Sequence, residues 1–250
     1  MSKQVSAERI DRLLQASCTF APASTRRMAI VGGVSGNIGD AISDLARATG
    51  FRVDSRDLAD GFDATRDRFK FDAGCDILVL AQGTMSLAWI GEQNEEDIQA
   101  PLDAILLASM RMVNEFVQTT REQPWLKYIV LIGSMAHRNV LNASSAYCAA
   151  KAGLAAFGRC AAWELAPRGY RVYTVHPGNV VDGPMSERTM QELARLHDLD
   201  AEAARRYWDA GRVLPEHVDK AEIARVVLEL VDGRHDHMAG ANIEFPAGQR

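Results

Sequence analysis

Short apolar runs alternate with segments of helical periodicity from residue 28 to the end of the chain. The runs are RMAIV, FRVDS, CDILVLA, KYIVLIGS, YRVYTVHPG and ANIEF, and four amphipathic segments separate most of them. Strands that alternate with helices form a parallel sheet with helices on both faces. A chain of 250 residues suits one domain of this kind. We therefore expect an α/β fold with a doubly wound, Rossmann-type parallel sheet over residues 28–250.

Two regions depart from this alternation. Residues 1–27 contain one short stretch of helical spacing, SAERIDRLLQA, followed by a polar connector, so we expect an N-terminal arm or docking helix. Residues 183–217 are polar and helix-patterned but lack an apolar run. We expect this second region to form a small helical flap at the substrate end of the sheet.

Charge and cysteine content exclude several classes of protein. The net charge is −5, without a basic stripe, so no nucleic-acid partner is expected. The four cysteines lie far apart, as is typical of reduced thiols in a cytoplasmic protein. No apolar run is long enough to span a membrane, and Glu8 and Asp11 argue against a signal peptide. His235 and His237 fit a solvated turn better than a metal site, and no metal is expected.

A glycine-rich stretch, IVGGVSGNIG, joins the first apolar run to the first helical segment. Gly33, Gly36 and Gly39 have a spacing of three and three. Glycines at a strand-to-helix turn permit a tight backbone and let a pyrophosphate approach the helix N-terminus. Because this loop follows the first strand of an alternating chain, we expect a dinucleotide cofactor here.

The end of the second strand selects the cofactor in a dinucleotide fold. A carboxylate there binds the ribose 2′-hydroxyl of NAD, and an arginine accepts the 2′-phosphate of NADP. The chain offers Asp54, Arg56 and Asp57 in VDSRD, and all three could also be solvated loop charges. Arg56, directly after Ser55, favours NADP over NAD. If Arg56 is not the ligand, Asp54 or Asp57 becomes the ribose ligand.

Ser134, Tyr147 and Lys151 have the spacing of a proton-transfer device. Tyr147 and Lys151 are four residues apart on a helical segment, so they share a face. A nearby ammonium stabilises a phenolate, so we expect Lys151 to lower the pKa of Tyr147. Ser134 ends an apolar strand, at the sheet edge where ligands bind, and its hydroxyl can orient a substrate oxygen.

Four further segments complete a resemblance to the short-chain dehydrogenase/reductase family over roughly residues 28–248. These segments are CDILVLAQG, FDAT, WELAPRGYRVYTVHPGNV and MAGANIEFPAG. The resemblance implies that Ser134, Tyr147 and Lys151 are catalytic, that Lys151 also binds the nicotinamide ribose and that Asp63 contacts adenine. It implies cofactor contacts at Gly33, Ser35, Asn37, Ile38, Asp63, Ala64, Ala81, Gln82, Gly83, Tyr147, Lys151, Pro177, Gly178 and Val180.

The chain departs from the family pattern at three places. In the glycine loop Asn37 stands where the family's middle glycine is expected, and we expect it to tolerate the left-handed backbone. The family's helix asparagine should fall near Ile105–Leu107, where none is found, so the proton relay through Lys151 is in question. The turn PGNVVDGPM is one residue longer than in the family and lacks its threonine, so we expect backbone at Val180 to replace it.

These features predict an NAD(P)-dependent oxidoreductase with a small-molecule substrate. We expect it to interconvert an alcohol and a ketone or aldehyde. The alternative is a catalytically weak dinucleotide-binding protein that serves as a sensor or assembly partner. The helical segments 101–118 and 144–165 carry more small and apolar residues than one buried face requires. They predict a homodimer or homotetramer, as in the family, unless residues 1–27 cover this surface within one chain.

Overall fold

The computed structural model describes residues 25–33, 37–120, 125–181, 183–210, 214 and 216–246. In this part of the chain six strands form one sheet in which all neighbouring strands pair in parallel. The strand order is β2(Arg52–Arg56), β1(Arg27–Val31), β3(Ile77–Leu80), β4(Lys127–Ile132), β5(Tyr170–Pro177), β6(Asn242–Phe245). The predicted Rossmann-type parallel sheet is confirmed, and its strands coincide with the six apolar runs.

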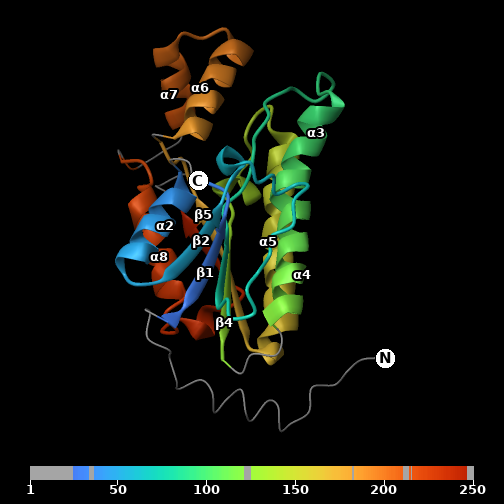
Figure 1. Cartoon of the computed structure of the whole chain (residues 1–250). Helices are drawn as coiled ribbons and strands as arrows, with labels where there is room; N and C mark the ends of the chain where they lie inside the picture. Colours follow the sequence, from blue (N-terminus) through green and yellow to red (C-terminus); the bar gives the residue numbers. More distant parts are fainter. Residues whose placement is uncertain are drawn as a thin grey trace.

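Helices cover both faces of the sheet (Figure 1). On one face α2(Ile38–Ala48) and α8(Lys220–Leu230) pack together against the sheet. On the other face lie α4(Ala108–Thr120) and α5(Ser145–Leu165). Because both faces are covered, β3 and β4 are buried along their whole length, which explains their continuous apolar sequences.

The segment between β2 and β3, residues 57–76, contains no strand or α-helix, only a 3-10 turn at Leu58–Asp60. Aromatic side chains hold it on the sheet instead. The rings of Phe69 and Phe71 are 4.6 Å apart, and those of Phe71 and Phe116 on α4 are 5.4 Å apart. Phe62 meets Phe69 edge-on at 5.9 Å. This aromatic segment therefore covers the sheet where the chain crosses from β2 over β1 to β3.

The long helix expected from residue 95 onward consists of three pieces. α3(Glu95–Pro101) begins with a capping box between Asn94 and Asp97. Residues Leu102–Leu107 form a π-helical segment, and α4 follows it. Pro101 lacks the N–H that would continue the ladder, and such an interruption favours a π-type bulge. The sequence predicted the helical character here but not the bulge.

The predicted flap consists of α6(Pro184–His197) and α7(Ala201–Asp209), which stand above the carboxyl ends of the strands (Figure 1). Side chains tie it to the body of the domain. The rings of Trp89 and His197 are 5.7 Å apart, and Asn142 Nδ2 donates to the hydroxyl of Tyr207 at 3.1 Å. The flap is therefore held in place by contacts with the loops that follow β3 and β4.

The expectation of an N-terminal arm falls on residues 1–24, which lie outside the described part of the chain. β1 begins at Arg27, one residue earlier than the predicted domain start. Arg26 is buried, and its guanidinium lies 4.9 Å from the ring centroid of Tyr128. In the described ranges, no helix has both the length and the apolar character needed to cross a bilayer.

Candidate active site

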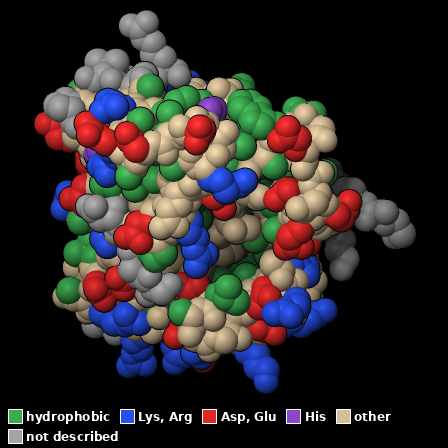
Figure 2. Space-filling view, turned by 90° about the horizontal axis from the view of Figure 1, so that it is seen from above, with side chains coloured by type: hydrophobic (Ala, Val, Ile, Leu, Met, Phe, Trp, Pro, Cys, Tyr) green, Lys and Arg blue, Asp and Glu red, His purple; other side chains and the backbone are tan. Residues whose placement is uncertain are grey.

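A cleft of about 1580 Å³ opens at the carboxyl ends of the strands, below the flap. Figure 2 shows this hollow from above, with charged side chains around its rim. The chain leaves β1 toward β2 on one side and returns to β3 on the other, so a crevice forms between these strand ends. The aromatic segment, the start of α2, the Pro177–Gly178 turn and the flap complete its walls.

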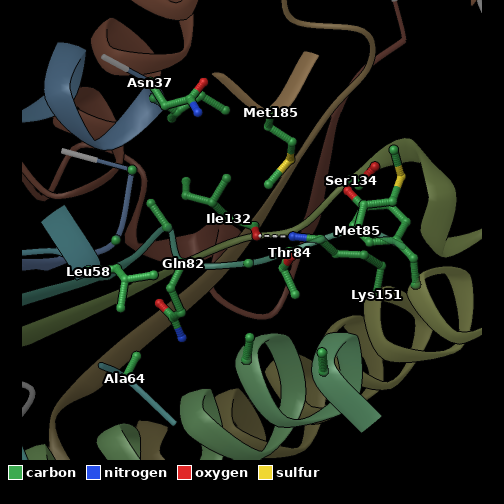
Figure 3. A pocket seen from close by; sticks show the side chains of 18 of the residues that line it. Asn37, Leu58, Ala64, Gln82, Thr84, Met85, Ile132, Ser134, Lys151 and Met185 are labelled. Atoms are coloured by element: carbon green, nitrogen blue, oxygen red, sulfur yellow. Dashed lines mark hydrogen bonds between the residues drawn. The ribbon is translucent and has the colours of Figure 1, made fainter. Parts of the chain in front are cut away.

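The cleft brings together nearly all the residues that the sequence singled out. Those that line it are Gly33, Asn37, Ile38, Asp63, Ala64, Ala81, Gln82, Gly83, Ser134, Tyr147, Lys151, Pro177, Gly178 and Val180. Ser35 lies outside the described residues, and Arg56 is not part of the lining. In Figure 3, Leu58, Ala64 and Gln82 lie at one end of the cleft, and Ser134, Met85 and Lys151 lie at the other.

Glycines shape the first turn of the cleft. Gly32 and Gly33 have φ values of +79° and +66°, a left-handed backbone that side chains disfavour. A Cβ on Gly39 would lie 2.2 Å from the carbonyl oxygen of Gly32, so the helix can approach the loop only because Gly39 has none. Asn37 is extended, with φ −119°, so the expectation that it would need to tolerate a left-handed backbone was wrong. The left-handed positions come earlier, at the two adjacent glycines.

The three predicted catalytic side chains meet at the other end of the cleft. Ser134 follows β4, and its hydroxyl is hydrogen-bonded to the phenol of Tyr147 on α5. Lys151, one turn further along α5, donates from Nζ to the carbonyl oxygen of Ile132 at 3.0 Å (Figure 3). Its Nζ lies 5.7 Å from the centroid of the Tyr147 ring. The arrangement places two hydroxyls side by side with a buried amine beneath them.

Burial dominates the protonation equilibria of this group. It raises the pKa of Tyr147, and the hydrogen bond from Ser134 opposes that rise. Burial also lowers the pKa of Lys151 to about 7. The net shift of the Tyr147 pKa in this structure is therefore upward, the reverse of the direction expected from Lys151. The ammonium is desolvated together with the phenol, and the lowering interaction comes from Ser134.

Comparisons with known proteins agree with this geometry. A family model described as enoyl-(acyl carrier protein) reductase, adh_short_C2, matches residues 37–249. The chain is 31% identical over 212 residues to "Dehydrogenase OXI1" of Cochliobolus heterostrophus, covering 82% of this chain and 85% of that one. The chain belongs to the short-chain dehydrogenase/reductase family.

Solved structures of the family share the fold. Sorbitol-6-phosphate 2-dehydrogenase from Erwinia amylovora superposes with a TM-score of 0.77 at 21% identity, covering 89% of this chain and 99% of that one. The actinorhodin polyketide ketoreductase with NADPH gives 0.76 at 18% identity, covering 91% and 99%. At these identities the likeness shows the fold alone.

An apolar side chain occupies the region where the family's helix asparagine is expected. Ile105 is fully buried in the π-helical segment, and a Cβ on Gly83 would lie 3.2 Å from Ile105 Cγ1 and 3.9 Å from Lys151 Nζ. The polar contacts here come from two other residues. Ser109 Oγ donates to the carbonyl oxygen of Ile105 at 2.6 Å, and Gln82 Nε2 donates to Ser109 Oγ at 2.9 Å. This short-chain dehydrogenase/reductase thus ties β3 to the bulged helix without the asparagine.

The end of β2 presents a carboxylate rather than an arginine to the cleft. Asp57 and Leu58 line the cleft, and Asp57 Oδ1 accepts the N–H of Leu58 at 2.7 Å. Arg56 instead pairs with Asp54, with 3.3 Å between its guanidinium and the carboxylate, and both side chains are about half exposed. The sequence left both kinds of ligand open, and the structure places only the carboxylate of Asp57 in the lining.

The adenine-side residues are held by their own hydrogen bonds. Asp63 accepts from the hydroxyl of Thr65 at 2.6 Å and from its backbone N–H at 2.8 Å, and these two hydrogen bonds, with a smaller contribution from Arg66, lower the pKa of Asp63. Arg111 on α4 donates to the carbonyl oxygen of Thr65 at 2.6 Å. The turn at Asp63 and Ala64 is therefore fixed against α4.

Sequence reasoning did not find Ser109 or Asn179. Asn179 lines the cleft and ties the flap to the Pro177–Gly178 turn, since its Nδ2 donates to the carbonyl oxygen of Trp208 at 2.8 Å. The signal for Ser109 was its position four residues after Ile105, where a hydroxyl can reach a carbonyl one turn back. Nothing in the sequence indicates the contact between Asn179 and Trp208, which are 29 residues apart.

Proposed function

We propose that the protein is an NAD(P)-dependent oxidoreductase that interconverts an alcohol and a ketone or aldehyde by hydride transfer. The observation that carries the proposal is the hydrogen-bonded pair of Ser134 and Tyr147 above buried Lys151, in the same cleft as the glycine loop. One end supports dinucleotide binding, and the other supports proton exchange with an oxygen.

The residues of the cleft fit a dinucleotide. The backbone at Gly32, Gly33 and Gly39 leaves no room for a Cβ at Gly32 or Gly39, as a close approach of phosphate requires. α2 directs its N-terminus at this turn, and the positive end of the helix dipole there favours an anion. Asp57 lies where a ribose hydroxyl would bind, and Asp63 and Ala64 supply the wall for adenine. When bound, the cofactor supplies or accepts the hydride.

The chain's own groups handle the oxygen and its proton. Tyr147 is protonated at neutral pH, since the ordinary pKa of a phenol is near 10 and burial raises the pKa of Tyr147 further, so it has a proton to donate to a carbonyl oxygen. Ser134 places a second hydroxyl beside that of Tyr147 and orients the same oxygen. Lys151 supplies a positive charge beneath the tyrosine when it is protonated, which stabilises the phenolate left after proton donation.

A coupled binding and turnover assay tests the proposal. Thermal shift with NAD and with NADP identifies the cofactor, and the absorbance of reduced nicotinamide then reports turnover with a panel of alcohols, ketones and aldehydes. We expect at least one pair of cofactor and substrate to turn over. Dinucleotide binding without turnover across the panel would instead support the sensor or assembly role, which the named dehydrogenases among the relatives do not favour.

We expect the wild-type protein to bind NAD more tightly than NADP, the reverse of the preference that Arg56 suggested. Asp57 lines the cleft and would repel a 2′-phosphate, while Arg56 faces Asp54 outside it. Asp57→Ala should weaken NAD binding about tenfold, the equivalent of one charge-assisted hydrogen bond. Titration of both cofactors into the wild type, Asp57→Ala and Arg56→Ala measures this.

Arg56→Ala is the matched comparison for that titration. It should leave the ratio of NAD to NADP affinity within about twofold, because its guanidinium pairs with Asp54 at the surface, where ion pairs are weak. A wild type that prefers NADP and loses that preference in Arg56→Ala would reverse the assignment.

The outer face of α5 predicts self-association. Trp163 is 86% exposed, and Leu107 and Met110 are exposed on the neighbouring helical segment. Exposed aromatic and apolar side chains on adjacent helices are typical of a subunit interface. Light scattering should give twice or four times the chain mass of 27.4 kDa. Trp163→Glu on α5 should lower that mass. Val140→Glu should not, because Val140 is equally exposed but lies on the loop after β4. A wild-type monomer would contradict the prediction.

A further inference from the structure

The backbone of Ser134 leaves the sheet and is held by side chains. The last ladder contact of β4 with β5 in this region is the N–H of Gly133, which donates to the carbonyl oxygen of Val175 at 2.6 Å. Beyond it, the N–H of Ser134 lies 3.3 Å from Nδ1 of His176 on β5. The carbonyl oxygen of Ser134 accepts the N–H of His137 at 3.0 Å and lies 2.9 Å from His137 Nδ1. Beyond the end of the strand pairing, two imidazole side chains therefore contact the backbone of Ser134.

His176 is fully buried behind the serine and belongs to no wall of the cleft. A Cβ on Gly133 would lie 2.4 Å from His176 Nδ1, so the imidazole can lie against this backbone only because residue 133 is glycine. On its far side His176 Nε2 is 3.0 Å from Oδ1 of Asn242 on β6. The ring thus bridges the end of β4 to β6 across β5.

These contacts define the tautomer of His176. Oδ1 of Asn242 can only accept, so Nε2 of His176 carries the hydrogen. Burial lowers the pKa of His176 to about 4, so the ring is neutral and Nδ1 is an acceptor. It therefore accepts the N–H of Ser134, and the 3.0 Å approach of Nδ1 to the carbonyl oxygen of Ser134 is not a hydrogen bond in this tautomer.

His137, whose ring packs on that of His176, adds a second contact to the backbone of Ser134. Its ring lies 3.8 Å from that of His176, centroid to centroid, and its Nδ1 donates to the carbonyl oxygen of Ser134. Its Nε2 is 3.3 Å from Oε1 of Glu244 on β6. Glu244 is in turn 3.1 Å from the guanidinium of Arg138. The backbone of Ser134 is therefore held at two atoms. His176 on β5 accepts its N–H, and His137, which contacts Glu244 on β6, donates to its carbonyl oxygen.

We propose that His176 is a positioning residue for Ser134: by accepting the serine N–H it fixes the strand end so that the Ser134 hydroxyl meets Tyr147. The proposal rests on the proposed function, since it concerns the alignment of a hydroxyl pair used in catalysis. His176 does not itself touch the cleft, so its effect passes through Ser134. Misplacement of a catalytic group by a fraction of an ångström is enough to slow a reaction, whereas cofactor binding at the glycine loop should be unaffected.

Three substitutions at residue 176 separate positioning from packing. In His176→Asn a side-chain oxygen replaces the Nδ1 acceptor near the serine N–H. His176→Gln places its amide nearer Asn242 and leaves the serine N–H without an acceptor. His176→Leu removes the contact with the serine N–H and the contact with Asn242. We expect kcat within about threefold of wild type for Asn but a fall of about tenfold or more for Gln and Leu, with KM for the cofactor unchanged. His237→Leu, on an exposed histidine, serves as the control.

A double-mutant cycle with Ser134→Ala shows whether the effect acts through the serine. In the Ser134→Ala background, His176→Leu should cause no further fall in kcat, because there is no hydroxyl left to position. Equal losses in both backgrounds, or equal losses for Asn and Leu, would overturn the proposal and leave only a packing role.

Histidine nitrogen NMR gives a readout that does not depend on turnover. With nitrogen-labelled histidine, the His176 resonances should show the neutral tautomer with hydrogen on Nε2 at neutral pH, in the wild type and in Ser134→Ala. A hydrogen on Nδ1 would refute the assigned contact even in an active enzyme. If the expected tautomer is observed but the protein has no oxidoreductase activity, the contact between His176 and Ser134 is supported and the proposed function is rejected.

Discussion

Tyr147→Phe should lower turnover by about 10²-fold or more and leave dinucleotide affinity nearly unchanged. The phenol hydroxyl meets that of Ser134, and the phenol is protonated at neutral pH, where even an unshifted tyrosine keeps its proton. Phenylalanine fills the same buried volume, so the loss is confined to the proton donor. Steady-state kinetics and cofactor titration on the purified variant measure the two quantities separately.

Tyr173→Phe provides the comparison for this result. Its hydroxyl donates to the carbonyl oxygen of His235 at 3.1 Å, far from the cleft, so its removal should leave turnover unchanged. Activity of Tyr147→Phe within about threefold of the wild type would rule out the acid–base role, since such groups contribute far more.

Lys151→Met should abolish most turnover and at the same time make the protein more stable. Lys151 is only 5% exposed, and its Nζ donates to the carbonyl oxygen of Ile132. Burial lowers its pKa from 10.5 to about 7, a difference worth at most ~5 kcal/mol at 1.36 kcal/mol per unit. Loss of the hydrogen bond offsets part of this gain, which leaves ~1–3 kcal/mol and a rise in Tm of roughly 3–8 °C.

The pH dependence of that stability gain follows from the direction of the shift. Between pH about 7 and 10.5 the unfolded chain holds the proton on Lys151 more tightly than the folded chain does. The cost of burying Lys151 is therefore full below pH 7 and is relieved as pH rises toward 10.5. The difference in Tm between variant and wild type should narrow over this range, as differential scanning calorimetry can show.

Lys127→Met separates stability from activity. Lys127 is also buried, and burial lowers its pKa to about 8, but it lies at the opposite end of β4 from the cleft. This substitution should leave turnover unchanged. A Lys151→Met protein that is less stable than the wild type at neutral pH would contradict the assigned cost of burial.

The positions of the strands along the chain and the location of the site could be predicted from the sequence, because they depend on periodicity and on short motifs. The apolar runs around Ile30, Val79 and Val130 became the central strands, and Ser134, Tyr147 and Lys151 met at the expected edge. The spacing of Tyr147 and Lys151 on one helix face is a local property. Local properties of this kind are readable without coordinates.

The errors arose where three-dimensional surroundings decide. The direction of the Tyr147 pKa shift depends on how much protein covers the phenol, which spacing does not reveal. Asn37 is extended, and among the described residues of this loop Gly32 and Gly33 have the left-handed backbone. The sequence analysis did not single out His176, whose ring contacts Asn242, a residue 66 positions away. Long-range contacts of this kind need the fold.

The aromatic segment, residues 57–76, links occupancy of the cleft to local folding. Phe69, Phe71 and Phe116 hold this wall by ring packing, without the hydrogen-bonded ladder that a helix or strand would give it. Such a region opens at lower free energy than the sheet beneath it, and its amides exchange with solvent through that opening. A ligand that contacts Asp63 and Ala64 stabilises only the closed wall. We therefore expect the amides of residues 57–76 to exchange more slowly with solvent when a ligand fills the cleft.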